Sequence, residues 1–173
     1  MRAVIALVGV IVLAFLAAGC GSDKSSESNS TTDWANSLCS AVTTYRQSVT
    51  DAADSLKSNV SQAGFKDATN QVQKATDTFV DTVKSLGKPD TKAGEQAKTT
   101  VETLSGQLQT GLDTVKNAGD QGLVQSLSTV TTALATAQTQ IKTAFDQLKG
   151  LDAQGELSDA FKQASACDSL RSG

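Results

Sequence analysis

Apolar residues recur at intervals of three and four along most of the chain, from Trp34 to Leu170. This spacing places them on one stripe of an α-helix, and no run alternates apolar and polar residues in the way that a strand does. Glycines and the single proline interrupt the stripes and divide the chain into separate helical segments. The expected helices cover residues 34–60, 65–86, 93–115, 123–151 and 157–170.

Four of these segments are long, each has one narrow apolar stripe, and the turns between them are short. Such helices bury their stripes against each other, and short turns make sequential neighbours antiparallel. The pattern predicts an all-α fold, an antiparallel up-down bundle of four long helices plus a short C-terminal helix. Because the stripes consist mainly of Ala, Val and Leu, we expect close packing with little central cavity. Gly106 and Gly111 in the third helix either admit that close packing or lie on an exposed face.

The N-terminus has a different pattern, a positively charged start followed by an apolar run that ends in Ala17–Cys20. This arrangement is typical of a secretory signal peptide. The junction resembles the bacterial lipobox, in which small residues precede a cysteine that is lipidated and becomes the first residue after cleavage. Ala17 stands where leucine is common in that motif. We expect a lipoprotein signal peptide at 1–19 and acyl chains such as palmitate on Cys20, with a plain transmembrane anchor as the alternative.

Residues 21–32 contain no hydrophobic side chain. A segment of this composition cannot offset the entropy lost on ordering. The sequence therefore predicts a lipid-anchored flexible Ser/Thr-rich tether at 20–32, followed by a helical bundle domain at 33–171. With the lipid anchor at Cys20, we expect the protein at the cell membrane, on its extracytoplasmic face.

The remaining cysteines form an even pair, Cys39 and Cys167. Export places them in an oxidising compartment, where two cysteines form a disulfide by default. A Cys39–Cys167 bridge would join the two ends of the domain. The alternative is two buried free thiols.

Composition excludes several functional classes. The chain has 173 residues, a formal net charge of −3 and no histidine. A nucleic-acid binder usually has an excess of basic residues, which this chain lacks. The absence of histidine excludes the common nucleophilic relays and the commonest zinc sites. Carboxylate pairs such as Asp51/Asp54 lack the tight loop that Ca²⁺ or Mg²⁺ requires. We therefore expect no enzyme, no catalytic residue, no metal, no cofactor and no nucleic-acid partner.

Three short stretches carry a resemblance to a known group of proteins. They are the Ala17–Cys20 junction, the DWANSLCS run at 33–40 and the ACDSL run at 166–170. Together with the polar tether, they resemble the small helical lipoproteins of actinobacteria. The resemblance implies a disulfide-closed helical bundle on the outer face of the cytoplasmic membrane. Because the activities of that group are mostly unknown, it implies no substrate.

Two functions follow from these expectations. The first is a monomeric, non-enzymatic lipoprotein with an interaction or scaffold role in the cell envelope, where its partner is an envelope protein. The alternative is a binding protein that holds a small or lipidic ligand between its helices. A contiguous cavity would support the alternative, and its expected lining is Phe65, Phe79, Leu104, Leu108 and Phe145.

Overall fold

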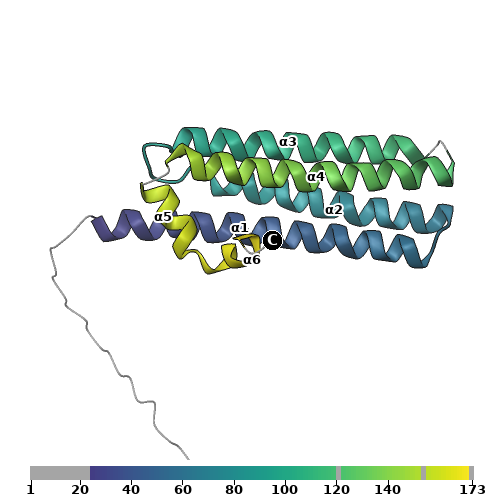
Figure 1. Cartoon of the computed structure of the whole chain (residues 1–173), viewed down its shortest axis with the longest axis horizontal. Coiled ribbons are helices and arrows are strands. Elements are labelled where there is room, and N and C mark those ends of the chain that lie inside the picture. The colour runs from purple at the N-terminus through teal and green to yellow at the C-terminus, as the bar shows by residue number, and fades with distance from the viewer. Residues whose placement is uncertain (1–23, 120–121, 153–154, 172–173) are drawn as a thin grey trace, which may run out of the picture.

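The computed structural model describes residues 24–119, 122–152 and 155–171, and every regular element in these ranges is helical. The elements are α1 (Lys24–Ser58), α2 (Gln62–Leu86), α3 (Gly94–Ala118), α4 (Leu123–Leu151), α5 (Glu156–Gln163), a 3-10 turn (Ser165–Cys167) and α6 (Asp168–Arg171). The predicted all-α bundle of four long antiparallel helices with a short C-terminal helix is confirmed (Figure 1). No helix within the described ranges is both long and apolar enough to cross a membrane.

The first helix starts earlier than predicted. It begins at Lys24 rather than at Trp34, so residues 24–32, predicted to be part of a flexible tether, are helical. No glycine or proline stands between this start and Ser58, so nothing stops the helix from extending toward the N-terminus. The Thr31 side chain is also buried, which adds packing to this extension. The predicted signal peptide at 1–19 and the lipidated Cys20 lie outside the described residues.

The break between the first two helices lies slightly before the predicted one. Gly64 was expected to separate them, but it lies in the first turn of α2. The Ser61 side chain caps this helix by accepting a hydrogen bond of 3.0 Å from the Gly64 backbone N–H. A Cβ atom at residue 64 would collide with the carbonyl oxygen of Asn59, so the turn itself requires glycine there.

The C-terminal segment is divided, whereas one helix was predicted over 157–170. Ala164 has an extended backbone, with φ −68° and ψ 105°, which separates α5 from the 3-10 turn. Beyond this break the Ala166 backbone N–H donates to the Asn36 side-chain oxygen of α1 at 3.1 Å. The turn brings Cys167 to Cys39, and the two form the predicted disulfide with a Cα–Cα distance of 5.0 Å.

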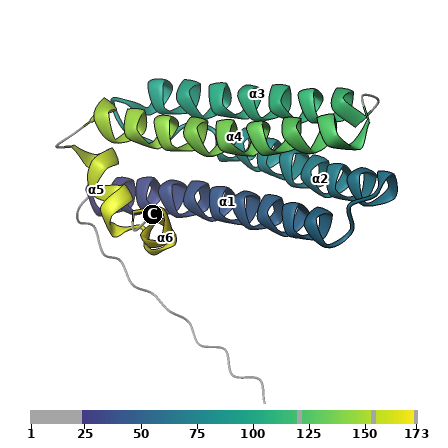
Figure 2. The same cartoon turned by 45° about the vertical axis from the view of Figure 1, so that its right-hand side comes forward.

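The short helix α5 is inserted between the first and last long helices at one end of the bundle. Direct packing joins α1 to α2, α2 to α3 and α3 to α4, whereas the backbones of α1 and α4 hardly approach each other. Figures 1 and 2 show α5 between these two helices. The Phe161 ring of α5 makes edge contacts with Trp34 of α1, at a centroid distance of 6.1 Å, and with Phe145 of α4, at 5.8 Å. Because helices in direct contact lie about 8–10 Å apart, the inserted helix holds α1 and α4 farther apart than that.

The apolar stripe of α4 is buried in only one half. Ile141, Ala144 and Leu148 near α5 are buried, whereas Leu127 and Leu134 in the N-terminal half are partly exposed. Burial of the stripe is incomplete because α5 packs only against the C-terminal part of α4, and the backbone of α1 does not approach the rest closely. Leu127 packs instead against a smaller cluster made of Ala52, Leu56, Phe65, Ala68 and Val115.

We predict that the Cys39–Cys167 disulfide contributes strongly to stability. The bridge joins residues separated by 128 positions, and chain entropy gives an upper value of about 4–5 kcal/mol for a loop of that length. Reduction, or the double substitution Cys39→Ala and Cys167→Ala, should lower the free energy of unfolding measured by chemical denaturation. The exposed neighbour Ser40 supplies the control, since Ser40→Ala should leave stability nearly unchanged. Two free thiols, or a covalent dimer, in non-reducing mass spectrometry of the exported protein would contradict this assignment.

Candidate functional site: an apolar cavity between the four long helices

A cavity of about 470 Å³ lies between the four long helices, toward the end of the bundle opposite α5. Its volume is about three times that of an engineered apolar cavity of ~150 Å³ that stays dry and binds benzene. It also falls within the range of roughly 300–1,000 Å³ that is usual for small-molecule sites. The main apolar lining side chains are Val49, Leu56, Phe65, Val72, Leu108 and Leu112.

The prediction of little central cavity was wrong. Part of the wall at this end consists of alanines, including Ala53 of α1 and Ala137 of α4, whose side chains are too short to span the space between these helices. Of the five residues expected to line a cavity, Phe65 and Leu108 do so. The other three residues are buried in the main core. They are Phe79, Leu104 and Phe145.

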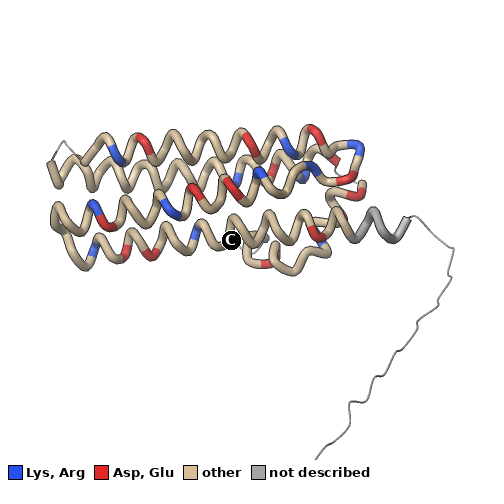
Figure 3. Tube along the Cα trace, turned by 180° about the vertical axis from the view of Figure 1, so that it is seen from behind, with Lys and Arg blue, Asp and Glu red and all other residues tan. Residues whose placement is uncertain are grey.

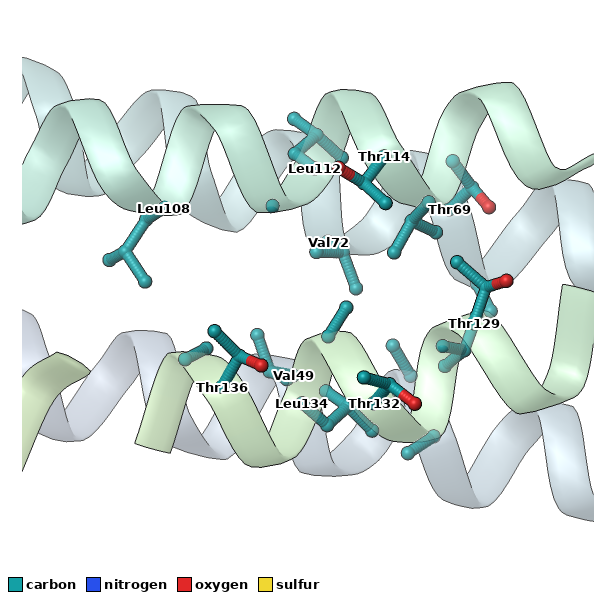
Figure 4. A pocket seen from close by; sticks show the side chains of 18 of the residues that line it. Val49, Thr69, Val72, Leu108, Leu112, Thr114, Thr129, Thr132, Leu134 and Thr136 are labelled. Atoms are coloured by element: carbon teal, nitrogen blue, oxygen red, sulfur yellow. The ribbon is translucent and has the colours of Figure 1, made fainter. Parts of the chain in front are cut away.

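The mouth of the cavity lies between α3 and α4. The lining residues that are exposed to solvent come from these two helices, and most carry hydroxyl or amide groups. They are Gln107, Thr110 and Thr114 of α3 and Gln125, Ser128, Thr132 and Thr136 of α4. Figure 4 shows Thr114 on α3 and Thr132 and Thr136 on α4 on either side of the space, with Val72 behind them. The site therefore has an apolar interior and a polar, uncharged rim.

Gly111 keeps part of this volume open. A Cβ atom added at Gly111 would meet no atom within 4 Å, and the same holds for Gly106. The expectation that these glycines admit close packing is therefore wrong for both. Gly106 lies on an exposed face outside the cavity, whereas Gly111 lines it. Each glycine costs about 1 kcal/mol relative to alanine in a helix, and at Gly111 that cost leaves space for a ligand.

Tyr45 forms part of the wall, close to the main core. Its ring lies 5.7 Å from the Phe79 ring and is buried. Burial raises the pKa of the Tyr45 phenol, and its hydrogen bond with Thr76 opposes part of that rise. The side chain consequently presents a neutral phenol to the cavity throughout the physiological pH range.

The carboxylates singled out in the sequence lie at the surface. Asp51 accepts a hydrogen bond of 2.8 Å from Gln47, and Asp54 forms an exposed ion pair of 2.9 Å with Lys57. Within the described part of the chain, no group of three His, Cys, Asp or Glu residues is arranged to hold a metal ion.

Sequence periodicity did not identify most of the cavity wall, because a wall residue and a core residue share the same helical spacing. Two signals were nevertheless present. Between Leu123 and Ile141 the sequence contains no Asp, Glu, Lys or Arg, and this uncharged run is the part of α4 that borders the cavity. Gly111 opposite it is the second signal.

We predict that Tyr45, the single tyrosine, ionises above the usual pKa of about 10 in the folded protein. Deprotonation would leave a charge in apolar surroundings, so the folded state favours the neutral phenol. The stability that this preference contributes is complete below pH ~10 and is lost as the pH rises through the pKa of the folded state. Ultraviolet absorbance of tyrosinate measures this ionisation. A midpoint equal to that of the unfolded chain would contradict the burial of Tyr45.

Comparison with known proteins provides no relative from which a function could be transferred. No protein-family model matches the chain. No curated protein and no solved structure matches it either. The function is therefore argued from the residues of this chain.

Proposed function

We propose that this chain is a lipid-anchored protein of the extracytoplasmic face of the cell membrane that binds a small apolar or lipidic molecule between its four long helices. One observation carries the proposal, the cavity of about 470 Å³ with an apolar interior. Each ligand methylene transferred from water into such a site contributes about 0.8 kcal/mol. The proposal requires no catalytic residue, metal or cofactor. The interaction or scaffold role stays a prediction, which a pull-down from intact envelopes would test.

The position of the cavity is compatible with an anchor at the N-terminus. The first residues of α1 lie at one end of the bundle, and the cavity residues of α1, from Tyr45 to Leu56, lie toward the other end (Figure 1). The mouth is formed by α3 and α4 rather than by α1. A lipid anchor at Cys20 would therefore leave the mouth accessible.

We predict that filling the cavity at Gly111 abolishes binding of an apolar ligand. Gly111→Leu should weaken the binding of the uncharged dye N-phenylnaphthylamine at least tenfold, about 1.4 kcal/mol, because the new side chain occupies open space in the site. Dye fluorescence measures the affinity.

Gly106→Leu is the matched control, because it replaces a glycine of the same helix that is also open but lies outside the cavity. Both variants improve helix propensity by up to about 1 kcal/mol, so loss of dye binding cannot be ascribed to unfolding. Failure of the wild-type protein to bind the dye, or equal binding by both variants, would contradict the proposed function.

We predict that the anchor depends on Cys20. Cys20→Ser should release the protein from the membrane fraction, since the proposed anchor consists of acyl chains attached at this residue. Cell fractionation with immunoblotting measures the distribution. A variant that stays entirely in membranes at full precursor size would favour the transmembrane-anchor alternative. Ligand binding by the bundle would be unaffected by that result.

A further inference from the structure

The cavity wall carries no formal charge. Among the described residues that line it there is no Asp, Glu, Lys or Arg. Figure 3 shows the N-terminal part of α4, next to the grey loop, as an unbroken tan stretch. An ionised head group inside such a wall would lose its hydration without gaining a partner charge, which is far more costly than burying a hydrogen-bonded neutral group. The wall thus disfavours ionised ligands.

Four of the six threonines that line the cavity have committed their hydroxyl protons to the helix backbone. Each of the four donates to the backbone carbonyl four residues earlier, with distances of 2.8 Å for Thr69, 3.0 Å for Thr110, 3.0 Å for Thr114 and 3.0 Å for Thr132. Their oxygens can still accept a hydrogen bond. These threonines therefore offer acceptors to a ligand rather than donors.

This arrangement discriminates between kinds of polar head group. A carboxylate or a phosphate has acceptors only, so the threonine oxygens cannot satisfy it. An alcohol has an O–H donor that these oxygens can accept. The side-chain amides of Gln107, Gln125 and Gln140, also on the lining, can donate to an ester, hydroxyl or carboxylate oxygen, so the discrimination against an anion comes from the absence of a cation in the wall and from the four committed threonines.

We infer that the ligand is an uncharged amphiphile, an apolar chain in the cavity with a hydroxyl-bearing head group at the threonine-lined mouth. The inference rests on the proposed function and narrows it to one chemical class. It follows from an uncharged wall together with hydroxyl oxygens whose protons are committed to the helix backbone.

Arg46 provides the alternative against which this inference is tested. Its side chain lines a smaller groove between α1 and α4, together with Asp54 and Lys57. This groove shares Tyr45, Val49 and Leu134 with the cavity wall. An anionic ligand would have to extend its head group between α1 and α4 to reach Arg46, whereas a hydroxylated ligand keeps it at the mouth.

The experiment compares two probes with the same acyl chain, monolauroylglycerol and laurate, by displacement of N-phenylnaphthylamine at neutral pH. We expect monolauroylglycerol to bind at least about tenfold more tightly, because a carboxylate finds no cation in the uncharged wall, whereas a hydroxyl donates to the threonine oxygens. Laurate that binds equally well or better, with an affinity that Arg46→Gln lowers, would overturn the inference and leave the proposed function intact. If neither probe nor the dye binds, the proposed function itself fails.

A pair of substitutions tests the role of the mouth threonines. Thr132→Val removes a hydroxyl from the mouth while keeping the shape of the side chain, so it should lower the affinity for monolauroylglycerol severalfold more than it lowers the affinity for the dye. Thr139→Val is the control, because Thr139 lies on the same helix, makes the same backbone hydrogen bond of 3.0 Å and is outside the cavity. Equal effects of the two substitutions would overturn recognition of the head group by the mouth.

Discussion

The insertion of α5 between α1 and α4 determines the shape of the whole bundle. Leu157 and Phe161 of this short helix are buried, and the Cys39–Cys167 disulfide fixes the segment that follows it against α1. Two helices separated by a third cannot also pack directly against each other at the usual distance of about 8–10 Å. The four long helices are therefore joined mainly as α1 to α2, α2 to α3 and α3 to α4, with a small contact between α2 and α4, rather than in a closed ring.

The cavity is a consequence of this geometry. Near α5, the gap between α1 and α4 is filled by the aromatic rings of Trp34, Phe145 and Phe161. Toward the opposite end the facing residues include Ala53 and Ala137, which are too small to fill it. Well-packed interiors contain few voids larger than a water molecule, so an apolar space of about 470 Å³ forgoes much stabilising contact. The Cys39–Cys167 disulfide lies outside the cavity and offsets this lost packing energy. The cavity itself therefore remains open to a ligand.

The sequence predicted the parts of the fold that depend on local spacing. The stripes defined four long helices, and the cysteine count identified Cys39 and Cys167 as a pair. Features that depend on contacts between distant segments were not predictable in this way. The position of Ala164 at a break in the last helix depends on Asn36 and Cys39 of the first helix. Likewise Leu134 and Ile141 have the same periodicity in the sequence, and only the location of α5 makes one of them a cavity residue and the other a core residue.

The central claim is that α1 and α4 stay apart beyond α5 and leave an apolar cavity between the four long helices. A crystal structure of the protein under xenon pressure tests this claim most directly, because xenon occupies dry apolar cavities. The account predicts xenon density among Val49, Val72 and Leu112, with α4 held away from α1. A structure in which α4 has moved onto α1, with no density at these side chains, would contradict it.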